Sequence, residues 1–204
     1  MKNSILAIFA VAAMVACKKN ETTAVDQSTD SNSVSAPADS GRVVGDSANV
    51  STDTKSTINA LSDQDKKFAD AAAKGGMMEV MMGKLAATNA SNATVKALGE
   101  MMVKDHGKAN DELKGWATKA GYALPTALDS DQQKKYDDLK AKKGAEFDKM
   151  YADLMVSDHK MDIAEFKKQA SEGTETSLKA FASGKVPTLE HHLMESEKAK
   201  AAVK

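Results

Sequence analysis

Three histidines and one glutamate are residue types that bind metals, and their positions place them on the inward faces of predicted helices. All four histidines of the chain lie beyond residue 58, where the sequence favours helices. With about 100° per residue, His106, His159 and His192 lie on or beside apolar helix faces. Glu79 lies within the apolar stripe of an earlier segment. Because imidazoles and carboxylates bind zinc, iron, manganese and copper, we predict one bound transition-metal ion with the ligands Glu79, His106, His159 and His192.

Three further polar residues stand next to these histidines in the sequence, namely Asp105, Asp158 and His191. Neighbours in a helix point about 100° apart, so an aspartate cannot share a ligand position with the histidine beside it. We expect Asp105 and Asp158 each to orient a histidine of another helix. We expect His191, like them, to lie around the metal ligands and not to bind the ion itself.

A metal-free interpretation stays open beside this one. An unsatisfied buried polar group costs roughly 1 to 3 kcal/mol, so four such groups are expected to meet one another. A buried network of histidines and carboxylates can also fix the register of helices without any ion. The protein would then be a non-catalytic envelope module for stress or interaction. A small-molecule site in a methionine-lined core is a third hypothesis, for which the sequence indicates no ligand.

Four amphipathic helices must position these residues. Beyond Ile58 the chain is rich in Ala, Lys, Met, Leu, Asp and Glu, which are mostly strong helix formers. Capping residues and apolar spacing predict helices that begin at 62, 92, 130 and 174. The third helix passes a weak point at Gly144, and the fourth is kinked or broken near Pro187. Four long helices with short loops predict an all-α four-helix bundle over residues 58–204.

The N-terminal 57 residues predict where the cell sends the protein. Residues 1–16 have the layout of a secretory signal, with Lys2 before a short apolar run. Met14-Val15-Ala16 before Cys17 resembles the lipobox of bacterial lipoproteins, so we predict that Cys17 is lipidated and anchors the protein to a membrane. Residues 17–57, rich in Ser, Thr, Asp and Ala, form a flexible tether. By resemblance to the lipoprotein sorting rule, Lys18 favours the outer membrane, with the bundle facing the periplasm.

Charge and motifs exclude several functions. The chain has 28 basic and 29 acidic residues and no basic stripe, so nucleic acid is not expected as a partner. The sequence has no glycine-rich phosphate loop and no nucleophile elbow, so we leave the question of an enzyme open and favour a binding role. The expected partners are the membrane, through the lipid anchor, and an envelope protein.

Five sequence segments resemble a known family. They are FADAAAKGGMMEV (68–80), MMVKDH (101–106), FDKMY (147–151), DH (158–159) and VPTLEHHL (186–193). In their order and spacing they resemble an uncharacterised family of bacterial outer-membrane proteins, domain of unknown function 4142, which has a ferritin-like bundle. The resemblance covers about residues 60–200 and implies that fold, but no substrate. Ferritin-like di-iron proteins use Glu-x-x-His motifs. Here Glu190 directly precedes His191 and His192, which argues against a di-iron centre and leaves a single-metal site open.

Overall fold

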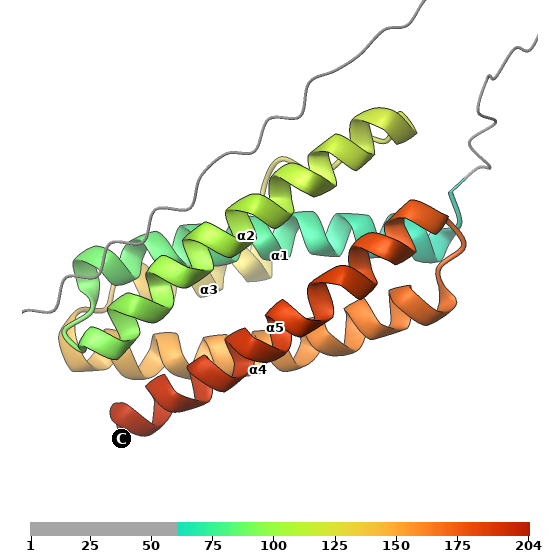
Figure 1. The fold of residues 1–204 in the computed structure, drawn as a ribbon. Helices are drawn as coiled ribbons and strands as arrows, with labels where there is room; N and C mark the ends of the chain where they lie inside the picture. Colours follow the sequence, from blue (N-terminus) through green and yellow to red (C-terminus); the bar gives the residue numbers. More distant parts are fainter. Residues whose placement is uncertain (1–60) are drawn as a thin grey trace, which may run out of the picture. The chain divides into compact units, whose positions relative to one another are not determined.

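The computed structural model describes residues 61–204, which form an all-helical bundle (Figure 1). Its helices are α1 (Asp63–Asn89), α2 (Ala93–Ala120), α3 (Ser130–Lys140), α4 (Gly144–Glu172) and α5 (Thr176–Ala202). The predicted signal peptide, Cys17 and the tether lie outside the described residues. Within residues 61–204, no helix has both the length and the apolar character needed to cross a membrane.

The four long helices form a ring. α1 packs against α2 and α4, and α5 packs against the same two helices from the other side. The short helix α3 packs on α1 and α4 at one side of the bundle (Figure 1). The prediction of an all-α bundle of four long helices is therefore confirmed, with α3 as an additional element.

The predicted helix starts are confirmed at two of the four positions and shifted at the others. The Ser62 side chain accepts a hydrogen bond from the Asp65 amide, and Asn92 caps α2 through the Thr94 amide. In α3 the cap is Asp129, one residue before the predicted position, and it forms a complete capping box with Gln132. The last helix is capped by the side chain of Glu175. Each cap satisfies amides that have no partner inside the helix.

One prediction about helix continuity was wrong, and of the kink or break expected near Pro187 the break is absent from α5. The helix expected over 130–173 is two helices, because the chain leaves the helical conformation after Lys140 and α4 begins at Gly144. Gly144 has a φ of 58°, a left-handed conformation that glycine adopts without steric cost. Conversely, α5 continues through Pro187 without a break. Pro187 and Ser183 are exposed, so the carbonyl that loses its partner to the proline can bind water.

Close packing of α1 on α2 depends on two glycines. A Cβ atom at Gly83 would lie 2.7 Å from the Gly99 carbonyl oxygen, and one at Gly99 would lie 2.5 Å from the Ala86 Cβ. Both distances are shorter than any ordinary van der Waals contact, so the two backbones approach closely only because these positions lack side chains. This approach draws the N-terminal half of α2 onto α1 and fixes the register between the two helices.

The apolar core has two parts. One contains Met82, Met102 and Met155, together with Phe147 and other residues from one half of the bundle. The other contains Phe68, Leu113 and Leu178. In α2, α4 and α5 a buried histidine stands between the residues of the first part and those of the second: His106, His159 and His192. In α1 the buried Glu79 follows Met78 of the first part. A polar layer thus crosses the middle of the bundle, and the buried methionines fill the core beside it.

Candidate metal centre

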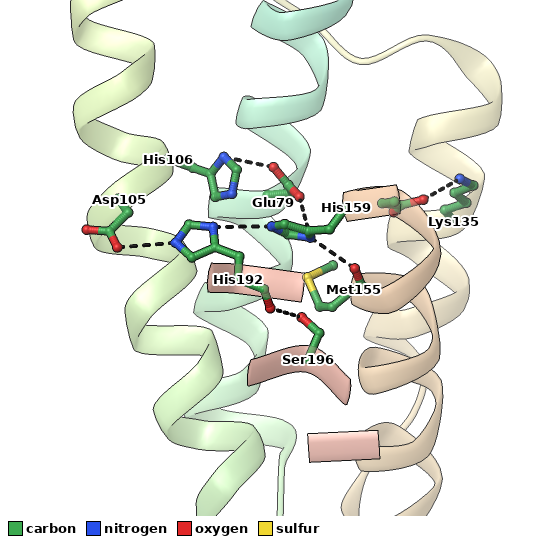
Figure 2. A network of polar contacts seen from close by, with 9 residues as sticks. Glu79, Asp105, His106, Lys135, Met155, His159, His192 and Ser196 are labelled. Carbon is green, nitrogen blue, oxygen red and sulfur yellow. Dashed lines mark hydrogen bonds and ion pairs between the residues drawn. The ribbon is translucent and has the colours of Figure 1, made fainter. Parts of the chain in front are cut away.

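The four predicted ligands lie together in the middle of the bundle. Each comes from a different long helix: Glu79 from α1, His106 from α2, His159 from α4 and His192 from α5. All are buried, with relative exposures of 1%, 7%, 0% and 1%. One ring nitrogen of each histidine lies within 4.8 Å of the corresponding nitrogens of the other two. Figure 2 shows the three rings turned toward one another.

His106 and Glu79 form the first pair of the cluster. The Nδ1 atom of His106 lies 2.8 Å from Oε2 of Glu79. Since a carboxylate only accepts, Nδ1 carries the proton of this ring. The other nitrogen, Nε2, is buried and has no hydrogen-bond partner within residues 61–204. Its lone pair points toward the other two histidines (Figure 2).

His159 is held by a backbone carbonyl. Its Nδ1 atom lies 2.9 Å from the carbonyl oxygen of Met155 and 3.4 Å from Oε1 of Glu79. Both neighbours are acceptors, so Nδ1 carries the proton and Nε2 keeps a lone pair. His159 therefore presents Nε2 to the interior of the cluster (Figure 2).

His192 is oriented by Asp105. Its Nε2 atom lies 3.2 Å from Oδ2 of Asp105, which places the ring proton on Nε2 and the lone pair on Nδ1. That Nδ1 atom lies 3.2 Å from Nε2 of His159. With these tautomers two lone pairs face each other at hydrogen-bonding distance, and no proton is left to lie between them.

Burial disfavours the proton that would relieve this contact. The pKa of His192 is lowered to about 4, because burial and the nearby His106 outweigh the effect of Asp105. Burial also lowers the pKa of His159, although Glu79 opposes this shift. Both rings are thus neutral near pH 7. His159 and His192 then each have one engaged nitrogen and one free lone pair directed inward.

The carboxylates around the cluster differ in their ionisation. Burial would raise the pKa of Glu79, but the attraction of His106 and the hydrogen bond from its ring lower it to about 2, so this group is an anion. Burial raises the pKa of Asp158, with Lys135 opposing the shift. The pKa of Asp162, one turn farther along α4, is raised well above its ordinary value by burial and by the charges of Glu79 and Asp158.

The structure refines the roles predicted from the sequence. Glu79 meets the cluster but lies behind His106, as the acceptor of its ring proton. Asp105 contacts His192, a histidine of another helix, through Oδ2. Asp158 differs from its prediction, because Oδ1 pairs with Lys135 of α3 at 3.2 Å. His191 is exposed and takes no part in the polar contacts of the cluster within the described chain, since it points away from the bundle axis.

Two partners were absent from the sequence prediction. The Met155 carbonyl holds His159, and Lys135 neutralises Asp158. The first could have been found from the i−4 position that a helical histidine reaches along its own helix. The second could not, because it depends on where α3 crosses α4.

The donor set fits a transition-metal ion. The nitrogens His106 Nε2, His159 Nε2 and His192 Nδ1 face inward, and imidazole nitrogens are ligands that zinc and copper bind. Two imidazole nitrogens on one tetrahedral ion lie about 3.3 Å apart, close to the 3.2 Å between His159 and His192. One nitrogen of each of the three rings lies within 4.8 Å of the corresponding nitrogens of the other two. Glu79 and Asp105 together supply two negative charges, which match a divalent cation.

Comparisons with known proteins identify a family. The model of the family described as "Domain of unknown function (DUF4142)" matches residues 50–199. No curated protein matches the sequence.

Solved structures share the fold at low sequence identity. A DUF305 fragment from Deinococcus radiodurans is 10% identical, with a TM-score of 0.62 over 70% of this chain and 98% of the other. A DUF305 protein from Streptomyces coelicolor is 17% identical, with a TM-score of 0.58 over 69% and 92%. CopM in a Cu(II)-bound form is 14% identical, with a TM-score of 0.57 over 69% and 97%. These similarities establish a shared helical-bundle fold.

Proposed function

Since the chain belongs to the family described as "Domain of unknown function (DUF4142)", whose description names no activity, we propose a function from the site itself: the protein binds one transition-metal ion through His106, His159 and His192. In this role Glu79 and Asp105 accept the outer ring protons of His106 and His192, and the Met155 carbonyl accepts that of His159. When bound, the ion supplies the positive charge that three inward lone pairs and two carboxylates require.

One observation carries this proposal. Nε2 of His159 and Nδ1 of His192 face each other at 3.2 Å, while the second nitrogen of each ring already meets an acceptor. A proton could bridge the two rings only if one of them became an imidazolium, or if one of them turned its unprotonated nitrogen toward its outer acceptor, Asp105 or the Met155 carbonyl. The first is disfavoured by the lowered pKa values of His192 and His159, and the second places two acceptors in contact. A cation satisfies all the donors at once.

Copper is the ion that we propose first. Imidazoles suit copper well, and divalent copper binds nitrogen sites more tightly than the other divalent ions of the first transition row. CopM, which shares this fold, has been solved in a Cu(II)-bound and an Ag-bound form. The function would then be binding or buffering of copper in the cell envelope, with zinc, iron and manganese as the alternative ions.

The envelope location rests on the N-terminal sequence. We propose that residues 1–16 are removed, that Cys17 is lipidated, and that the chain up to residue 57 tethers the bundle to the periplasmic face of the outer membrane. Several acyl chains on one residue anchor a protein stably, whereas a single chain does not. Labelling with a radioactive fatty acid should mark the wild-type protein and leave Cys17→Ser unmarked. Label retained in Cys17→Ser would contradict the anchor.

Elemental analysis tests the metal site. The protein is purified without a polyhistidine tag, equilibrated with micromolar copper or zinc, and desalted before its metal content is measured. We expect one ion per chain in the wild type and in His191→Gln, which removes an exposed histidine beside the site. His159→Gln should retain less than a tenth of that amount. A wild-type protein that takes up no metal contradicts the proposal.

A further inference from the structure

A cavity leads from the surface of the bundle to the histidine cluster. It has a volume of about 300 Å³, and its inner wall includes His106 and His192. Lys108, Glu112 and Glu165, which also line it, are exposed side chains of α2 and α4. The cavity therefore connects solvent with two of the three histidines, while His159 lies behind them with an exposure of 0%.

Gly75 keeps part of this cavity open. It lies in the interior of α1, one turn before Glu79, where glycine costs about 1 kcal/mol relative to alanine. A Cβ atom there would have no neighbour within 4 Å among the described residues, and Gly75 lines the cavity. The next residue differs, since a Cβ at Gly76 would clash with the side chain of Asn110. Packing explains Gly76, but not Gly75.

The walls indicate which molecules fit. Aromatic and aliphatic side chains make up much of the lining, including Phe68, Phe166, Leu113 and Leu189. The charged side chains of the lining are mainly acidic, with Glu79, Asp105, Glu112 and Glu165 against Lys108 and Lys185. Lys185 also pairs with Glu112 at 2.5 Å. An anion would meet repulsion along this path, whereas a small uncharged molecule would not.

The described part of the chain brings too few donors together to enclose an ion. Within residues 61–204, three histidine nitrogens converge, and the nearest carboxylates are turned onto the outer nitrogens of His106 and His192. Structural zinc sites are closed by four protein ligands, whereas sites with three keep a position for water or substrate. The cavity reaches the cluster on the side of His106 and His192.

We propose that this cavity is a binding site for a small uncharged molecule with a nitrogen or oxygen lone pair, which takes the coordination position that the three histidines leave open. The inference rests on the proposed metal site and adds an external molecule that binds to the ion beside the three histidines. The volume of about 300 Å³ limits the size of the ligand, the acidic side chains of the wall disfavour an anion, and Gly75 leaves the space in which the ligand lies.

Imidazole is a suitable probe for this site. The full chain is loaded with Cu²⁺, desalted and titrated with imidazole, while the visible absorption band of copper and the copper content per chain are recorded. We expect a saturable shift of the band at an unchanged content of one copper per chain. Azide, an anion of similar size, should bind at least threefold more weakly than imidazole.

Two substitutions in the cavity wall and one control substitution locate the binding site. Gly75→Leu fills the cavity and should weaken imidazole binding at least tenfold with copper retained, and Ala72→Leu provides a second obstruction on the same wall. Gly115→Leu is the matched control, because Gly115 lies in the interior of α2, has open space around it and does not line this cavity. It should bind imidazole as the wild type does. Circular dichroism confirms that each variant is folded.

The outcomes separate the two proposals. A copper-loaded wild type whose band does not shift overturns the ligand site alone, and so does loss of copper as imidazole is added. Equal binding of azide overturns the uncharged ligand class, and unchanged imidazole binding in folded Gly75→Leu and Ala72→Leu overturns the cavity as its location. A wild type that holds no copper overturns the proposed metal site and this inference with it.

Discussion

Two buried polar networks in this bundle differ in how completely their hydrogen bonds are made. At one end, the Asp65 carboxylate accepts from the side chains of Ser62, Gln169 and Thr174 and from the Thr174 amide, at distances of 2.5 to 3.1 Å. In the middle, the histidine cluster leaves His106 Nε2 and Glu79 Oε1 without hydrogen bonds to other described residues. The first network joins the start of α1 to the loop before α5 and leaves no carboxylate oxygen unpaired.

This difference distinguishes a network that stabilises the fold from one that is a candidate binding site. A polar group that only fixes helix register is expected to be fully satisfied, because each unsatisfied buried group costs roughly 1 to 3 kcal/mol. The Asp65 network meets this expectation, and the histidine cluster does not. Nε2 of His106, Nε2 of His159 and Nδ1 of His192 face one another (Figure 2), which is the arrangement that the proposed metal site requires.

Removal of the Asp65 carboxylate should have the largest effect on stability. Asp65→Ala leaves the buried Gln169 side chain and the Thr174 amide without their acceptor. We expect a loss of roughly 3 kcal/mol in the free energy of unfolding, measured with urea on metal-free protein. Metal content at saturation should stay at one per chain. A loss of metal in a folded Asp65→Ala protein would show that the two networks are not independent.

Metal binding should stabilise the folded chain through the histidine cluster alone. At a free metal concentration a hundred times the dissociation constant, the free energy of unfolding should rise by about 2.7 kcal/mol. The same addition should leave the melting temperature of His159→Gln unchanged and should stabilise Asp65→Ala as much as the wild type. Equal stabilisation of His159→Gln would place the ion elsewhere.

Without metal, the facing histidines should contribute little to stability. The double substitution His159→Leu, His192→Leu replaces two facing acceptors with apolar groups of similar size, and Asp105 stays partly exposed, with 27% of its side chain accessible. We expect the free energy of unfolding of the metal-free protein to change by less than about 1 kcal/mol. A loss of several kcal/mol would favour the interpretation in which the cluster is structural.

Acid should affect the two networks over different pH ranges. The pKa of His192 is about 4 in the folded state and about 6.5 when unfolded, so the unfolded chain binds the extra proton. Protonation of His192 should therefore lower the free energy of unfolding of the metal-free protein as the pH falls from about 6.5 to about 4. His192→Gln should reduce this loss, and His191→Gln should not. Four hydrogen bonds lower the pKa of Asp65 despite its burial. The stability that the ionised Asp65 carboxylate contributes is therefore lost only below about pH 4, where the unfolded chain binds its proton. Urea titrations across this range measure both.

The sequence predicted the fold and the members of the cluster for a clear reason. Four polar residues on apolar faces near the middle of four long helices must meet when short loops fold the helices antiparallel. Capping residues at Ser62 and Asn92 fixed two helix starts correctly. The break before Gly144 was missed, because a helical pattern resumes immediately beyond it.

The atomic roles could not be predicted. Whether Glu79 contacts a metal or the ring proton of His106 depends on the rotation of α1 against α2, which the close approach at Gly83 and Gly99 determines. Asp105 reaches His192 because α2 and α5 are neighbours, whereas Asp158 meets Lys135 of α3. Spacing along one helix carries no information on such contacts between helices.

X-ray absorption at the edge of the bound metal tests the central claim most directly, because it counts the ligands of the ion. The copper-loaded wild type should show three imidazole ligands, and Glu79→Gln, which keeps the shape of the side chain, should still show three. His106→Gln should show two imidazoles or no bound copper. A wild-type spectrum with fewer than two imidazoles, or one in which Glu79→Gln loses a directly bound oxygen, would contradict the assignment of the three histidines as the metal ligands.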